Sequence, residues 1–177
     1  MRKHAALLGA LLLAVLPACP SHPRAPRVAP AADVTVPIEG AIRGVAATSG
    51  LQFAAVEANP SDHASALRAF RGVAEAWHGD IAGSAGPIAA TDKLVVATSV
   101  VGAGSQLDGA AVRGEPAAAI RAFDATSGAV KWTRVFDSTE WALATSIAVA
   151  GDGVIVGGTF GGTLRAGKHV VSSAGGS

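Results

Sequence analysis

The feature that most constrains this chain is an internal repeat. One phrase occurs three times, as VAATSGLQFAA at residues 45–55, IAATDKLVVAT at 88–98 and IAVAGDGVIVG at 147–157. A second phrase occurs twice between these copies, as ALRAF at 66–70 before Trp77 and as AIRAF at 119–123 before Trp132. A repeat spacing of about 40 to 60 residues indicates a unit that buries its apolar face against neighbouring copies. The repeat therefore predicts a modular, stacked architecture.

The first phrase carries the signals of a β-hairpin. In its third copy, the β-prone runs 145–150 and 154–160 flank Gly151-Asp152-Gly153. An Asp-Gly pair between such runs favours a tight turn, because primed turns need positive φ at their centre. Residues 48–50 and 91–93 stand at the same place in the other copies. Each copy is therefore expected to form a hairpin.

The second phrase predicts another hairpin. Residues 120–124 and 129–136 are β-prone and are joined by a segment in which Asp124 can bond the turn backbone and Gly128 can take a left-handed conformation. The earlier copy has a shorter turn at Arg71-Gly72. An amphipathic helix over 61–77, capped by Ser61, is the alternative for that copy. The repeat favours the hairpin, because the matching segment holds a turn at its middle.

Two hairpins per repeat give four strands per unit, the composition of a β-propeller blade. We therefore expect an all-β fold over residues 34–177, a partial β-propeller of four-stranded antiparallel blades. The region supplies two to three blades, and the last is incomplete at its C-terminal end. A closed ring takes at least about four blades. The open blade edge is then expected to continue in a longer product, or to be covered by self-association or by a protein partner.

The start of the chain predicts export. Arg2 and Lys3 precede an apolar run over residues 5–16, which is too short to span a bilayer and suits the core of a secretory signal. The run ends in LPAC at residues 16–19, which resembles the lipobox of bacterial lipoproteins. We expect residues 1–18 to be a lipoprotein signal peptide and Cys19, the single cysteine, to be lipidated. A plain secreted protein is the alternative.

Residues 19–33 are expected to form a tether. Four prolines between residues 20 and 30 exclude a helix and do not suit a central strand. An extended segment of this kind would hold the folded region away from a membrane lipid attached to Cys19. The expected location is the cell envelope, with the outer membrane or cell surface favoured over the inner membrane.

The repeats also resemble known families. Residues 119–132 and 144–160 resemble bacterial β-propeller repeats, and residues 161–176 resemble the β-propeller repeat of bacterial surface proteins. The phrase FDATSGAVKW at 123–132 is similar to quinoprotein-like propeller repeats, in which an Asp, a Gly and a Trp recur at this spacing. The resemblance implies a propeller fold. It does not imply an activity, because propellers host enzymes, binding modules and scaffolds alike.

The aromatic residues are expected to serve packing. Trp77 and Trp132 hold the same repeat position, and an aromatic recurring once per unit is expected to pack between neighbouring units. Trp141 lies outside the pattern. It is a candidate either for a binding surface or for a satellite core contact.

The sequence shows no catalytic, cofactor-binding or metal site. None of the four histidines after the signal peptide has a second His or Cys at zinc-ligand spacing: His22, His63, His78 and His169. Three aspartates are expected in turns and lack the ligand spacing of a calcium loop: Asp124, Asp137 and Asp152. The glycine pairs around Phe160 precede no helix, so they do not indicate a phosphate loop.

These patterns favour a non-enzymatic, lipid-anchored module for protein interaction or scaffolding. The formal net charge is +1 and no basic run occurs, so a nucleic-acid partner has no support. One alternative is a scaffold lipoprotein resembling the propeller subunit of the outer-membrane β-barrel assembly machinery. Another is a fragment of a quinone-dependent dehydrogenase, which would need a bound quinone and calcium.

Overall fold

The computed structural model describes residues 36–59, 64–108, 110–112, 116–151 and 153–174. Every regular element in these ranges is a β-strand, and no helix occurs among them. The described residues belong to one compact unit, Val34–Ser177. The expected signal peptide at 1–18, the lipidation site Cys19 and the tether at 19–33 lie outside the described residues. The all-β prediction for the repeat region is confirmed.

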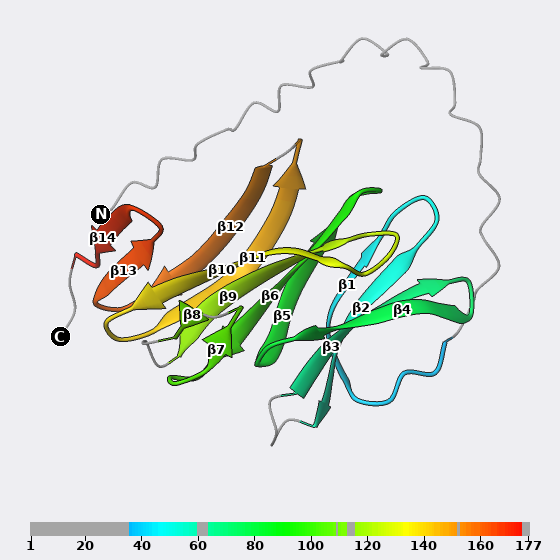
Figure 1. The fold of residues 1–177 in the computed structure, drawn as a ribbon, viewed down its shortest axis with the longest axis horizontal. Coiled ribbons are helices and arrows are strands. Elements are labelled where there is room, and N and C mark those ends of the chain that lie inside the picture. The colour runs from blue at the N-terminus through cyan, green and yellow to red at the C-terminus, as the bar shows by residue number, and fades with distance from the viewer. Residues whose placement is uncertain (1–35, 60–63, 109, 113–115, 152, 175–177) are drawn as a thin grey trace, which may run out of the picture. The chain divides into compact units, whose positions relative to one another are not determined.

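Sheet I is a four-stranded antiparallel meander in the order β1-β2-β3-β4 (Figure 1). Its strands are β1 (Ala41–Ala47), β2 (Gln52–Asn59), β3 (Ala64–Arg71) and β4 (Ala74–Ile81). Sheet I thus contains one copy of each repeated phrase. The alternative helix over 61–77 is wrong, because Gly72, with a φ of 62°, turns the chain between β3 and β4.

Sheet II has six strands in the order β14-β13-β10-β9-β6-β5. Its first four strands along the chain are β5 (Ser84–Ala90), β6 (Leu94–Val101), β9 (Ala117–Asp124) and β10 (Val130–Ser138). Between β6 and β9 the chain forms a small hairpin from β7 (Gln106–Leu107) and β8 (Ala110–Ala111), which sequence patterns did not predict. The last hairpin, β13 (Thr163–Ala166) and β14 (His169–Ser172), pairs with the end of β10.

Among the described residues, sheet III consists of two strands, β11 (Ala142–Ala150) and β12 (Gly153–Phe160). It contains the third copy of the first phrase. The sheets do not close on themselves.

The three copies of the first phrase share one register. The equivalent cross-strand pairs are Ala46↔Phe53, Ala89↔Val96 and Ala148↔Ile155. The first two turns also share their bonding: the Thr48 and Thr91 amides donate to the Leu51 and Leu94 carbonyls over 2.8 and 2.7 Å. Sequence equivalence is therefore structural equivalence, and each position in sheet III has a known counterpart in sheets I and II.

The sheets pack face to face through alternate side chains. Val95 and Ala97 on β6 belong to a core shared with sheet I, whereas Val96 belongs to a core shared with sheet III. This alternation follows from the two-residue period of a strand. The central strands β6 and β9 of sheet II are thereby buried on both faces, between β1–β4 and β11–β12 (Figure 1).

The far face of sheet I is covered by the chain itself. Ala54, Val56 and Phe70 form a small cluster on that face, and Val36 and Ile38 pack against it. Sheet I is therefore also covered on both faces over this part of its surface.

Candidate interaction surface

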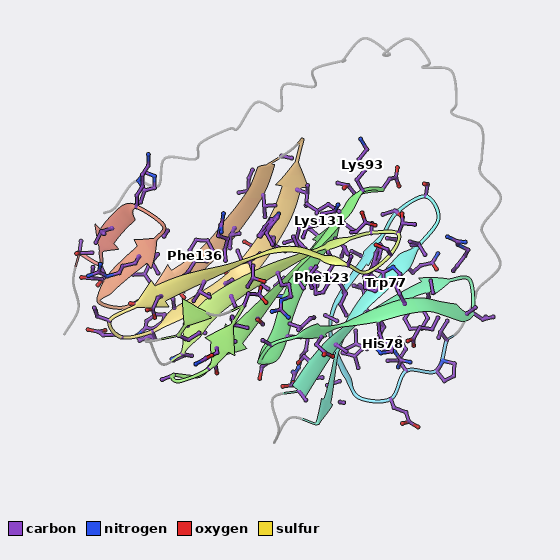
Figure 2. All side chains as sticks on the ribbon, in the orientation of Figure 1. Trp77, His78, Lys93, Phe123, Lys131 and Phe136 are labelled. Carbon is purple, nitrogen blue, oxygen red and sulfur yellow. The ribbon has the colours of Figure 1, made fainter. Side chains whose placement is uncertain are left out.

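Trp77 lies between sheets I and II, as predicted from its repeat position. Its ring is 5.9 Å from that of Phe53 and stacks on that of Phe123 at 6.2 Å and 27° between planes (Figure 2). Its indole nitrogen, Nε1, donates a hydrogen bond of 3.0 Å to the carbonyl of Ala125. Phe53 and Phe123 are buried, with 2% and 0% of their surfaces exposed. Trp77 thus joins the two sheets by aromatic packing and by one polar bond.

Trp132 holds the equivalent place on the other side of sheet II. It packs against the core that sheets II and III share, together with Val154 and Val156 of β12. Among the described residues, Trp132 has no aromatic ring partner and its indole nitrogen makes no hydrogen bond. The prediction that Trp132 packs between repeat units is confirmed. Within the described structure it lacks the stacking partner and the indole hydrogen bond that Trp77 has.

The difference arises at the outer edge of β12. In sheet I the second strand, β2, pairs with β3 on that edge, and in sheet II β6 pairs with β9. Within the described part of the chain, β12 pairs with β11 only. Its outer edge therefore presents backbone amides and carbonyls that its counterparts use in a ladder.

The outward face of sheet III is also uncovered. Ile155 is 63% exposed, whereas its counterparts Phe53 and Val96 are 2% and 0% exposed. Those two side chains are buried because a further sheet packs on them. Ile155 occupies the same position with no such sheet among the described residues, so its apolar side chain is exposed.

Sheet III also lines an apolar pocket of about 200 Å³. It lies between sheets II and III and is lined by side chains of β9 to β13, among them Phe136 (labelled in Figure 2), Leu143, Val156, Phe160 and Leu164. Thr159 is the one lining residue with a hydroxyl, and no acid, base or thiol lines the pocket. Its chemistry therefore suits apolar contact.

Arg121 forms a polar bridge that sequence patterns did not identify. From β9 it donates to the Thr133 hydroxyl at 3.1 Å, to the Asp80 carbonyl of sheet I at 3.1 Å, and to the Asp108 carboxylate at 3.0 Å. The repeated Arg of the second phrase was the available signal, but its partners are far apart in sequence. Arg121 therefore ties sheet II to sheet I and to the β7–β8 hairpin.

A second polar cluster lies on the surface of sheet I. Glu75 accepts hydrogen bonds from Arg68, and one of its oxygens is 2.9 Å from Nδ1 of His78. Desolvation raises the pKa of Glu75, but the bonds and charges of Arg68 and His78 outweigh it and hold the pKa below the usual 4.5. These contacts form a surface ion-pair network.

The remaining candidate residues that the structure describes do not lie together in one site. His22, His63 and Asp152 lie outside the described residues, His169 is exposed at the start of β14, and Asp137 lies in β10 rather than in a turn. Asp124 does lie at a turn, where it accepts hydrogen bonds from the amides of Thr126 and Ser127. In the described ranges no three His, Cys, Asp or Glu residues group as metal ligands.

Trp141 packs against the backbone near the end of β12. Its carbonyl accepts a bond of 2.9 Å from the Gly161 amide, and a Cβ at Gly161 would lie 2.6 Å from the indole nitrogen. The side chain stays 37% exposed. This placement fits a satellite packing contact.

No helix long and apolar enough to cross a membrane occurs within the described ranges. Comparisons with protein-family models, with curated proteins and with solved structures found no match to this chain.

Proposed function

We propose that this chain is a lipid-anchored module of β-propeller blades in the bacterial cell envelope, and that it binds a protein partner through sheet III. Sheet I and the β5-β6-β9-β10 part of sheet II are the complete blades, and β11–β12 is the first half of a third. Cys19 carries the lipid, and residues 19–33 act as the tether. No catalytic step is assigned to the module.

The arrangement of the first strands supports the propeller assignment. β5, the first strand of sheet II, contacts β1, the first strand of sheet I, and also β11, the first strand of sheet III. Blades of a propeller meet through their first strands around a common axis while their faces stack on one another. The two shared cores and the common register agree with this arrangement.

The observation that carries the binding proposal is the contrast at Ile155. A large apolar side chain that is buried in sheets I and II is 63% exposed in sheet III, beside a strand edge that no other described strand pairs with. Exposed apolar area next to an open edge is the usual signature of a protein-binding surface.

Site-specific crosslinking tests the proposed function. The full chain, with its native N-terminus, is produced in a Gram-negative host with a photoreactive amino acid at Ile155. The matched control has it at Val73, which is 69% exposed in the β3–β4 turn. We expect a discrete protein adduct in the membrane fraction from position 155 and none from position 73, and we expect Cys19→Ser to release the chain from that fraction.

Equal crosslinking at both positions, or none at position 155, would overturn the binding role. Membrane retention of the Cys19→Ser variant would overturn the anchor. A quinone chromophore in the visible spectrum of the purified chain would replace the binding role with that of a dehydrogenase fragment.

A further inference from the structure

The kind of segment that the β12 edge accepts can be read from the other two units, and this step rests on the proposed function. We propose that the edge binds an extended segment of a partner polypeptide with the pattern Ala-Leu/Ile-Arg-Ala-Phe. The segment adds as an antiparallel strand and its Phe ring stacks on Trp132. Strand addition of this kind draws affinity from main-chain hydrogen bonds and specificity from alternate side chains.

The register of sheets I and II defines the pattern. The edge of β2 is paired with ALRAF and the edge of β6 with AIRAF, in the same register: Ala54↔Arg68 and Gln52↔Phe70, Ala97↔Arg121 and Val95↔Phe123. The counterparts on β12 are Val156 and Val154, by the shared register of the first phrase. An added strand in this register places its Arg opposite Val156 and its Phe opposite Val154.

The two faces of sheet III then decide where these side chains go. Directly opposed residues of an antiparallel pair project to the same face. Val154 projects into the core shared with sheet II, where Trp132 also packs. The added Phe therefore faces Trp132, as Phe123 faces Trp77. The Ala that precedes it lies opposite Ile155, as Ala69 and Ala122 lie opposite Phe53 and Val96.

The indole nitrogen of Trp132 needs a hydrogen-bond acceptor, and the added segment can supply one. Trp77 donates from Nε1 to the carbonyl of Ala125, two residues beyond the stacked Phe123. A segment that continues past its Phe brings an equivalent carbonyl to Trp132. In sheet I, Gly79 allows the Phe123 ring to approach the backbone of β4. The equivalent residue of sheet II is Arg134, by its pairing with Ile120, as Gly79 pairs with Leu67. Arg134 is exposed, and its flexible stem would lie along the added ring.

A second copy of this chain is the less suitable occupant. Its two matching segments, β3 and β9, are each paired on both sides and cannot be donated without opening a sheet. The face of sheet I that would stack on sheet III is partly covered by Val36 and Ile38. A strand from a different polypeptide meets neither obstacle.

Peptide binding to the purified chain tests the proposal. The probe is a fluorescein-labelled peptide with the sequence of residues 117–126, and the controls are the same peptide with Phe123→Ala and a scrambled peptide of equal composition. We expect saturable binding of the probe, a dissociation constant about tenfold weaker for the Phe-to-Ala form, and no binding of the scrambled form. Sedimentation of the chain alone reports its own association.

A second readout does not depend on any protein variant folding. The chain is labelled with 5-fluorotryptophan, which gives one fluorine signal for each of its three tryptophans. We expect the probe to shift the Trp132 signal and to leave that of Trp77 in place.

Equal affinity for the scrambled peptide, or an unshifted Trp132 signal at saturation, would overturn the proposal. Self-association that excludes the probe would overturn it in favour of a second copy. Adduct formation at position 155 without probe binding would leave the proposed function standing and remove only this partner class.

Discussion

Trp77 and Phe123 stack across the boundary between sheets I and II, with ring centroids 6.2 Å apart, and the Trp77 indole donates a hydrogen bond to Ala125 just beyond that ring. The two residues come from different repeats, so they come into contact only in the folded chain. Trp132 has the same place in its repeat but no such partner among the described residues.

Trp77→Ala should destabilise the chain much more than Trp132→Ala. Replacing a packed aromatic residue by Ala costs about 3–5 kcal/mol, and the Trp77 substitution also removes a hydrogen bond. The Trp132 substitution removes fewer contacts and should cost less than half as much. Urea unfolding followed by far-ultraviolet circular dichroism measures both. Equal losses would show that Trp132 is already fully packed in solution.

Gly128→Ala should cost more than Gly72→Ala. Both glycines have positive φ, 73° and 62°, so an Ala at either position strains the backbone by about 1–2 kcal/mol. At Gly128 the added Cβ would also lie 2.6 Å from the Trp77 ring, whereas at Gly72 it meets no atom within 4 Å. We expect about 1–3 kcal/mol of additional loss at Gly128 from overpacking. Equal unfolding midpoints would contradict the close approach of this turn to Trp77.

Asp124 should make stability depend on acid pH. Hydrogen bonds from the Ser127 amide, Lys131, the Ser127 hydroxyl and the Thr126 amide lower the pKa of Asp124 from 3.8 to about 2. Because the folded-state pKa is the lower one, the stabilisation is present above about pH 3.8 and is lost as the pH falls through about 2.

Asp124→Asn should flatten the dependence of stability on pH in that window. Asp92→Asn is the matched control, since the Asp92 carboxylate accepts one bond, of 3.1 Å, from Ser49 in a neighbouring turn. Unfolding midpoints measured from pH 2 to 5 make the comparison. An unchanged slope in the Asp124 variant would contradict the bonding of the turn.

Arg121→Lys should weaken the attachment of β9 to its surroundings. The planar guanidinium reaches three acceptors, on Thr133, Asp80 and Asp108, and an ammonium cannot satisfy this geometry. We expect a loss of about 1–2 kcal/mol in unfolding free energy. Arg68→Lys is the control, because the Arg68 side chain hydrogen-bonds one residue, Glu75, and otherwise lies over the Phe70 ring, both within sheet I. A smaller loss of unfolding free energy at Arg121 than at Arg68 would contradict the bridging role of Arg121.

Much of the fold follows from sequence because the repeat compensates for weak local signals. The segment 61–77 alone fits a helical face, but its match to 119–132 favoured a hairpin, which the structure has. Turn chemistry at Asp124 and Gly128 likewise followed from residue type, since few residues adopt positive φ. These are local properties, and a short stretch of sequence contains them.

Other features depend on distant contacts and could not be predicted. The three acceptors of Arg121 lie in β4, β10 and the β7–β8 connection, and nothing in the phrase AIRAF indicates them. The pairing of β13 with the end of β10 is also non-local. The exposure of Ile155, at a position where Phe53 and Val96 are buried, also depends on which sheets stack on one another. The repeat shows that Phe53, Val96 and Ile155 are equivalent positions, whereas their different exposures are a property of the folded structure.

Amide hydrogen exchange along β12 reports whether its outer edge is open in the free chain. β6 is paired on both edges, by β5 and β9, so its amides should be uniformly protected. β12 pairs with β11 alone in the described structure, so alternate amides, those facing away from β11, should exchange rapidly in the free chain. Uniform protection of β12 at the level of β6 would show that the edge is already covered, and would contradict an open surface available to a partner.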